Sequence, residues 1–131
     1  MRLENWRHAQ DQGAVAGRNA AGASDTYTTV PSFWSEQYDL YIQSVGWPAH
    51  GRTRVHRALG CDPSHRSGEA AKADNQLVFE IAGGCVAYAT GINAQRDLAA
   101  VRRLIERRVP VDPAALADPA QSLAAMLKRS G

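Results

Sequence analysis

The most regular alternation of apolar and polar side chains lies between residues 38 and 46. An alternation with a period of two predicts a strand with one buried face and one wetter face. Phe33 and Trp34 stand just before this strand, where the chain arrives from a polar segment. The faces of the predicted strand are Tyr38, Leu40 and Ile42 on one side and Asp39, Tyr41 and Gln43 on the other.

Two further stretches also predict strands. Residues 76–92 predict a hairpin, because two alternating runs flank Gly83 and Gly84, which adopt the positive φ of a tight turn without strain. One face of the return strand holds only small residues, and we expect it to lie under a helix. Residues 52–59 predict a weaker strand, which we place at a sheet edge because Arg57 interrupts its apolar face.

The N-terminal segment predicts a helix over residues 3–21, with Asn5 as its expected N-cap. Positions four residues apart on this helix are small, and they include Gly13 and Gly17. Each interior glycine costs a helix about 1 kcal/mol relative to alanine, so two of them indicate close approach of another backbone or a flat ligand. The alternative is a frayed terminal helix without a role. A polar linker, residues 23–29, follows this segment.

Three helix starts are expected in the C-terminal third. Asn93 is the expected N-cap of an amphipathic helix, and Asp112 and Asp118 each precede a proline that favours the first helical position. The order of elements predicts an α+β fold, in which the C-terminal helices cover an antiparallel sheet of about three to five strands and the N-terminal helix is additional. The expected helix anchors are Leu98, Val101, Leu104, Ile105, Leu116, Leu123, Met126 and Leu127.

Composition narrows the class of protein. The chain has 131 residues, 44% of them hydrophobic, which predicts one ordinary domain with its own core. A formal net charge of +2 is too small to favour nucleic acid as a partner. No apolar run is long enough for a membrane span, and no N-terminal apolar segment predicts a secretory signal. We therefore expect a cytoplasmic protein without a membrane partner, with Cys61 and Cys85 as reduced thiols.

The sequence offers no catalytic group of its own. The spacings of His50, His56, Cys61 and His65 match no zinc pattern, so we expect no metal site. Neither a G-x-G-x-x-G nor a P-loop motif occurs, so no phosphate-binding loop is present. The arginine-rich segment 96–108 is either a solvated helix face or a docking surface for an acidic partner.

Two tryptophans allow a functional and a structural interpretation. Trp6 falls in the first turn of a predicted helix, where unpaired backbone N–H groups suit an anionic ring such as the pyrimidine edge of a reduced flavin. Trp34 falls just before a predicted strand, and a neighbouring indole is able to cover such a ring. The alternative is that both are ordinary core or surface aromatics.

Four motifs resemble, in order, those of one family, the oxygenase-coupled, FAD-dependent ferredoxin reductases. This is the biphenyl dioxygenase and putidaredoxin reductase type within the pyridine nucleotide-disulphide oxidoreductase superfamily. The first motif resembles the helix that closes the family's FAD domain, and the second resembles the stretch that opens its C-terminal domain. The motifs are RLENWRHAQDQGAVAGRNAAG (2–22), VPSFWSEQYDLYIQSVG (30–46), GINAQRDLAAVRRLI (91–105) and VDPAALADPAQSL (111–123).

The resemblance implies a division of the chain and a set of functional residues. Residues 1–22 would be the last helix of an FAD domain, residues 23–29 a linker and residues 30–131 the reductase C-terminal domain. The family passes hydride from NAD(P)H to FAD and then single electrons to a ferredoxin-type iron–sulfur protein. The implied cofactor-facing residues are Glu4, Asn5, Trp6 and Trp34, and the implied partner-docking residues are Phe33, Trp34, Gln37, Arg103 and Arg107.

The family pattern also includes two upstream nucleotide-binding domains, each with a glycine-rich fingerprint that these 131 residues do not contain. We therefore expect the chain to be the C-terminal portion of a ferredoxin reductase, which neither binds FAD nor catalyses electron transfer alone. The alternative is a free-standing module that binds a protein partner or forms a homodimer. Packing of the small-residue stripe Ala9–Gly13–Gly17–Ala21 against another surface would favour the module, and its exposure would favour the reductase portion.

Overall fold

The structure is a computed structural model that describes residues 3–38, 40–48, 52–60 and 75–128. Helices and strands together form an α+β fold, as predicted, with a helix at the N-terminal end. The elements are α1 (Trp6–Ala20), β1 (Ser32–Gln37), β2 (Leu40–Gly46), β3 (Thr53–Gly60), β4 (Asn75–Ala82), β5 (Cys85–Ile92), α2 (Gln95–Glu106), α3 (Pro113–Ala117) and α4 (Leu123–Lys128).

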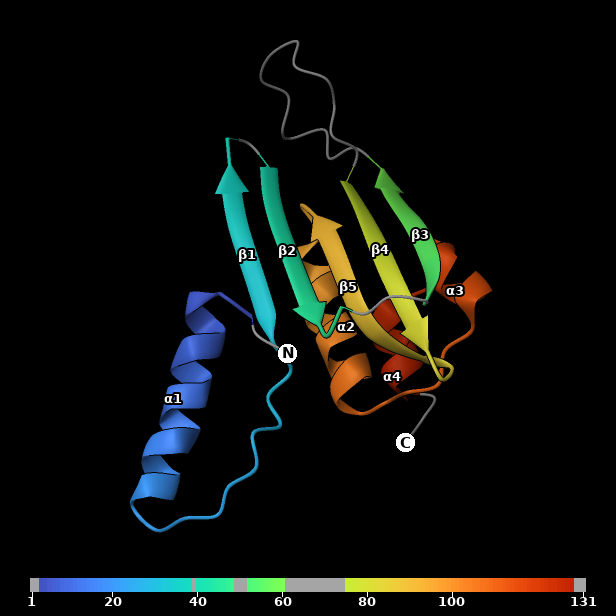
Figure 1. Cartoon of the computed structure of the whole chain (residues 1–131). Coiled ribbons are helices and arrows are strands. Elements are labelled where there is room, and N and C mark those ends of the chain that lie inside the picture. Colours follow the sequence, from blue (N-terminus) through green and yellow to red (C-terminus); the bar gives the residue numbers. More distant parts are fainter. Residues whose placement is uncertain (1–2, 39, 49–51, 61–74, 129–131) are drawn as a thin grey trace.

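The five strands form one antiparallel sheet in the order β1-β2-β5-β4-β3. Helices α2, α3 and α4 lie on one face of this sheet, which we call the helix-covered face, while α1 lies beside the β1 edge (Figure 1). Helix α2 contacts β5 and β2, α4 packs on α2, and α3 packs on β3. The main core therefore lies between the helices and the central strands.

The first two strands form a hairpin, and here the predicted pattern was wrong. A single strand beginning at Tyr38 was expected, with Phe33 and Trp34 before it. Instead Phe33 and Trp34 lie within β1, and the chain reverses at Tyr38, whose φ of 57° is left-handed and whose side chain is fully exposed. The turn contains no glycine or proline, so its usual sequence signal is missing.

The second hairpin and the helix above it follow the predicted pattern. Gly83 and Gly84 have φ values of 58° and 76° and connect β4 to β5. The small residues of β5 do lie under a helix. A Cβ added to Gly91 would lie 2.8 Å from Leu77 Cδ2 and 2.9 Å from Leu98 Cδ1. Buried apolar side chains on both sides of this contact include Val45, Leu77, Phe79, Ala89, Leu98, Val101, Leu104, Leu116 and Leu123.

Strand β3 lies at the sheet edge, as predicted, but Arg57 does not interrupt its inner face. Arg57 is only 4% exposed, and it faces the helices because it pairs directly with the buried Leu77. Its guanidinium donates four hydrogen bonds of 2.7–3.3 Å to the backbone carbonyls that connect α3 to α4. These bonds satisfy the terminal nitrogens and stabilise the buried charge, whereas the Arg57 Nε is buried without a hydrogen-bond partner among the described residues. The acceptors are Leu116, Asp118, Pro119 and Gln121.

Two of the four N-caps predicted from the sequence are confirmed. Asn5 caps α1 by accepting from the backbone N–H of His8 at 2.8 Å, and Asp112 caps α3. Asn93 does not cap α2, whose N-cap is Ala94 without a side-chain hydrogen bond. Asp118 does not start a helix either. It ends α3 and closes a turn, and α4 begins only at Leu123.

Replacement of Arg57 by methionine tests the anchoring of the C-terminal helices. Arg57→Met keeps an apolar side chain of similar length but leaves four carbonyls without their charged donor. We expect the free energy of unfolding in urea to fall by about 3 kcal/mol. Arg103→Met, at an exposed position of α2, should change it by less than about 0.5 kcal/mol. Equal effects of the two substitutions would show that the Arg57 network does not anchor the helices.

Candidate functional site

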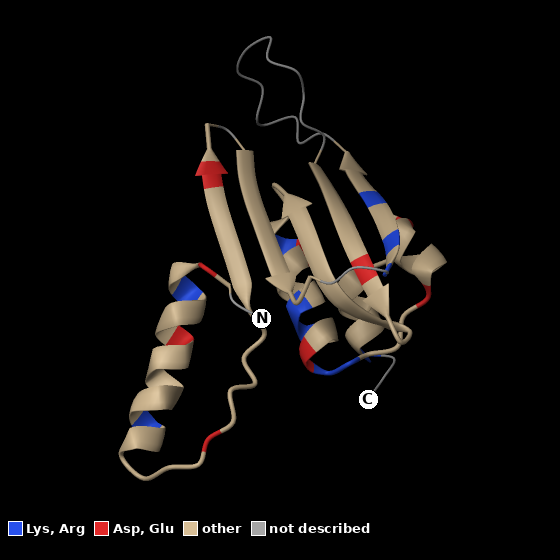
Figure 2. Ribbon diagram, viewed as in Figure 1, with Lys and Arg blue, Asp and Glu red and all other residues tan. Residues whose placement is uncertain are grey.

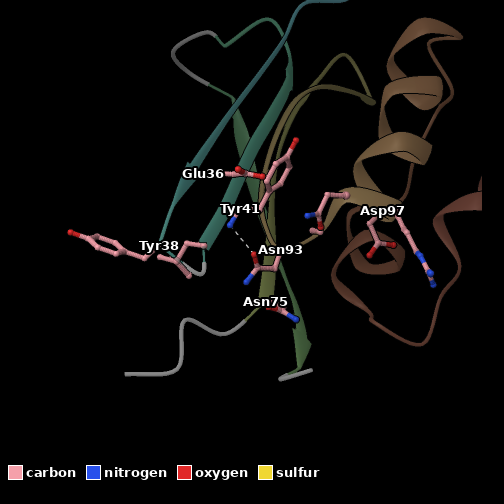
Figure 3. Close-up of a pocket in the computed structure, with 10 residues that line it drawn as sticks. Glu36, Tyr38, Tyr41, Asn75, Asn93 and Asp97 are labelled. Atoms are coloured by element: carbon pink, nitrogen blue, oxygen red, sulfur yellow. Dashed lines mark hydrogen bonds between the residues drawn. The ribbon is translucent and has the colours of Figure 1, made fainter. Parts of the chain in front are cut away.

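The candidate site is a pocket of about 610 Å³ at the end of the sheet where the β1–β2 turn meets the start of α2. Side chains from β1, β2, the β5–α2 junction and the first turn of α2 converge on it (Figure 3). Glu36 and Asp97 contribute carboxylates, and Arg96 contributes a guanidinium. The remaining lining residues are Tyr38, Leu40, Tyr41, Asn75, Asn93, Ala94 and Gln95.

Asn93 holds the two sides of this pocket together. Its φ of 51° is left-handed, a conformation that asparagine tolerates better than most residues. Its side-chain Oδ1 accepts from the backbone N–H of Tyr41 at 2.8 Å, and its own N–H donates to the Tyr41 carbonyl at 2.8 Å (Figure 3). These bonds occupy the Asn93 side chain, which explains why it does not cap α2.

An aromatic pair lies on the same sheet face as the pocket. The rings of Trp34 and Tyr41 are stacked, with centroids 6.2 Å apart and planes at 9°. Trp34 pairs with Gln43, which in turn pairs with Gly91, so its side chain points to the helix-covered face. Trp34 is nevertheless 59% exposed, because α2 covers β2 and β5 and does not reach β1. The pair is therefore an accessible aromatic surface beside a polar pocket.

The five predicted docking residues do not form one surface. Phe33 pairs with Ser44 and Gln37 with Leu40, so both side chains point to the opposite face of the sheet from Trp34. Arg103 is exposed on α2, outside its buried stripe, and Arg107 is exposed at the C-cap of that helix. The structure therefore groups Trp34 with Tyr41 and the pocket, and it separates this group from Phe33 and Gln37.

The predicted cofactor-facing residues at the N-terminus lie elsewhere. Glu4 and Trp6 are exposed, and Trp6 retains 74% of its accessible surface. Asn5 lines a small hollow of about 80 Å³ together with Phe33, on the opposite face of β1 from Trp34. Asn5 thus adjoins one face of the sheet, and Trp34 belongs to the other.

A second aromatic cluster was not predicted from the sequence. His8 is 4% exposed, its Nδ1 lies 3.0 Å from the Tyr27 hydroxyl, and its ring meets those of Tyr27 and Trp47 edge to face. The Trp47 N–H donates to the Ala87 carbonyl, so the cluster connects α1 and the linker to β5. Its members are 19 and 39 residues from His8 in sequence, and no local pattern relates them.

The small-residue stripe of α1 is exposed. A Cβ added to Gly13 or Gly17 would meet nothing within 4 Å, and Ala9 and Ala21 are exposed as well. By the criterion stated above, this exposure favours the reductase portion over a self-packed module.

Metal chemistry and membrane insertion find no support in the described residues. Within the ranges given above, no three histidine, cysteine or acidic side chains are grouped as metal ligands. His50, Cys61 and His65 fall outside those ranges. Among the described helices, none combines the length and apolar character of a membrane span.

The fold and site together define a class of protein. The chain is an α+β domain with helices on one sheet face and an accessible aromatic pair at a sheet edge, which suits contact with another protein or domain. The comparison with known families goes further: residues 32–127 match the family described as Reductase C-terminal. The chain belongs to this family of reductase C-terminal domains.

Curated relatives agree with this assignment. The chain is 38% identical over 128 residues to the ferredoxin–NAD(+) reductase component of the anthranilate 1,2-dioxygenase system of Burkholderia cepacia. It is 34% identical over 119 residues to the corresponding component of the p-cumate 2,3-dioxygenase system of Pseudomonas putida. These matches cover 97% and 90% of this chain but only 29% and 27% of the relatives. The chain thus spans somewhat more than a quarter of their length.

A solved structure supports the fold. The reductase in the covalent putidaredoxin reductase–putidaredoxin complex superposes with a TM-score of 0.79 at 23% identity. The superposition covers 99% of this chain and 28% of that one. The agreement includes α1, so the helix and the sheet occur together in a known arrangement.

The environment of Tyr27 predicts that the attachment of α1 depends on pH. Burial, and next the Asp11 carboxylate, raise the pKa of Tyr27 above its ordinary value of 10.0. The folded state then holds the Tyr27 proton more tightly than the unfolded state, so this contribution to stability is complete below pH 10 and is lost as pH rises through the folded pKa. We expect the urea midpoint to fall as the pH rises above about 10.

Tyr27→Phe should reduce this fall, because it removes the titrating hydroxyl. Tyr38→Phe is the matched control, since Tyr38 is fully exposed in the β1–β2 turn. Urea unfolding followed by tryptophan fluorescence at each pH measures the effect. If the two variants keep the same pH dependence as the unaltered chain, Tyr27 does not couple α1 to pH.

Proposed function

We propose that this chain serves as the C-terminal domain of an FAD-dependent ferredoxin reductase, which passes electrons from NAD(P)H through FAD to a ferredoxin-type iron–sulfur protein. The family match over residues 32–127 is the observation that carries the proposal. The flavin and both nucleotide sites belong to parts of the reductase outside these 131 residues. The chain alone is accordingly not a catalyst and does not retain FAD.

Within such a reductase the two faces of β1 have different tasks. The group formed by Trp34 and Tyr41 contacts the iron–sulfur protein, because it is accessible and aromatic and its two rings are stacked. Asn5 and Phe33 adjoin the other face, and together with the neighbouring Glu4 and Trp6 they contact the flavin-binding part. Arg103 and Arg107 attract an acidic partner at long range and contribute little to the bound complex.

This division follows from the geometry of a single strand. Adjacent side chains of β1 point to opposite faces, so one short segment reaches two neighbours at once. Exposure of the α1 stripe supports the same proposal over a module whose α1 packs on its own sheet, because nothing in the described chain covers Gly13 or Gly17.

Substitution of Trp34 tests the docking role. Trp34→Ala should weaken binding of putidaredoxin, the partner in the solved complex, by about tenfold or more, because it removes the central aromatic contact. Arg107→Ala should weaken it by less than about threefold, and mostly through the association rate. Surface plasmon resonance at two salt concentrations separates the two effects.

Trp6→Ala is the matched control, since it removes an indole that is even more accessible, from another part of the chain. It should leave putidaredoxin binding unchanged. Equal losses for Trp34→Ala and Trp6→Ala, or no loss for Trp34→Ala, would remove Trp34 as the docking residue.

A further inference from the structure

A second cleft lies at the opposite end of α2 from the pocket in Figure 3. It has a volume of about 1000 Å³, and its walls come from the linker, the segment after β2, the β4–β5 turn and the last turns of α2. We call it the arginine cleft. The residues that matter to its chemistry are Thr28, Trp47, Arg52, Arg102 and Arg108.

The lining of the arginine cleft is basic. Three guanidinium groups, from Arg52, Arg102 and Arg108, share it with a single carboxylate, that of Glu106. Basic positions gather at the lower end of α2 and in the segment after it (Figure 2). Arg102 Nε donates to Glu106 Oε1 at 2.9 Å, so the one carboxylate is already paired. The lining therefore has an excess of two positive charges for an anion.

The guanidinium groups keep donors available for a ligand. One nitrogen of Arg52 donates to the Trp47 carbonyl, and Arg102 uses Nε, which leaves the terminal nitrogens of Arg102 unengaged among the described residues. Planar guanidinium groups bind carboxylates through two parallel hydrogen bonds. Thr28 lies in the same lining, and its hydroxyl adds a neutral donor.

The rest of the lining is apolar and includes a fixed aromatic wall. Val30, Val86, Ala87 and Ile105 contribute aliphatic surface beside the Trp47 indole. The Trp47 ring contacts the His8 ring edge to face, with ring centroids 5.9 Å apart and planes at 87°. The Trp47 backbone N–H donates to the Ala87 carbonyl at 3.0 Å. A preorganised indole provides a stacking surface without loss of rotamer freedom on binding.

These features together select one class of ligand. An inorganic anion would bind the guanidinium groups but would not contact the apolar lining. A neutral aromatic molecule would contact the apolar lining but leave the positive charges uncompensated. We infer that the arginine cleft binds an aromatic carboxylate, whose ring contacts Trp47 and whose carboxylate contacts Arg102 and Arg108. The inference does not rest on the proposed electron-transfer function, because it uses the opposite end of α2.

A titration with benzoate, monitored by NMR, tests this inference on the full chain. The three tryptophans, Trp6, Trp34 and Trp47, each provide one indole N–H signal. Benzoate should shift the Trp47 signal in a saturable way with a dissociation constant of about 1 mM or below. The Trp6 and Trp34 signals are internal controls and should not move. Benzamide and inorganic phosphate, each lacking one feature of the ligand, should bind about tenfold more weakly or not at all.

Two substitutions separate the cleft from a general charge effect. Arg102→Gln removes one guanidinium from the lining and should weaken benzoate binding by about fivefold. Arg103→Gln removes the same charge from an exposed position of α2 outside the cleft and should leave binding unchanged. Circular dichroism confirms that both variants fold, and Arg108→Asn provides a second lining variant should Arg102→Gln fail to do so. No shift of the Trp47 signal, equal binding of phosphate, or equal loss in the lining and control variants would overturn the inference.

Discussion

The close approach of α2 to β5 at Gly91 determines how the rest of the structure is arranged. Any side chain at this position would meet Leu77, Ala94 and Leu98 at 2.8–3.0 Å, so only glycine lets the helix lie this close. Fully buried leucines of strand and helix meet across this contact, and dense packing of this kind is what fixes a unique arrangement. Both ends of α2 are thereby placed at ends of the sheet, where one forms the polar pocket and the other the arginine cleft.

The two edges of the sheet differ in how the helices cover them. On the β3 side, the Arg57 guanidinium donates hydrogen bonds to the segment that connects α3 to α4. These bonds anchor the helices to an edge strand. On the β1 side α2 does not reach beyond β2, and the stacked Trp34 and Tyr41 remain accessible. One edge is thus used for stability and the other is available for contact with a partner, which is consistent with the role proposed for a reductase C-terminal domain.

Local patterns predicted the α+β fold, the β4–β5 hairpin and the buried stripe of α2, because periodicity and glycine turns are signals contained within a few residues. The β1–β2 hairpin was missed because Tyr38 makes the turn without such a signal. Arg57 was misinterpreted because a charge in a strand pattern predicts exposure, whereas its acceptors lie 59–64 residues further along the chain. The His8 cluster could not be predicted from local patterns either, because only tertiary packing brings its rings together.

The most direct test of the account asks which face of β1 meets the iron–sulfur protein. A ferredoxin-type iron–sulfur cluster is paramagnetic after one-electron reduction and then broadens NMR signals of nearby residues, so addition of reduced putidaredoxin to the isotopically labelled chain maps the contact even when binding is weak. The account predicts broadening of the Trp34 indole and Tyr41 signals while the Phe33, Gln37 and Trp6 signals stay sharp. Broadening of Phe33 and Gln37 with an unaffected Trp34 indole would contradict the assignment of the two faces.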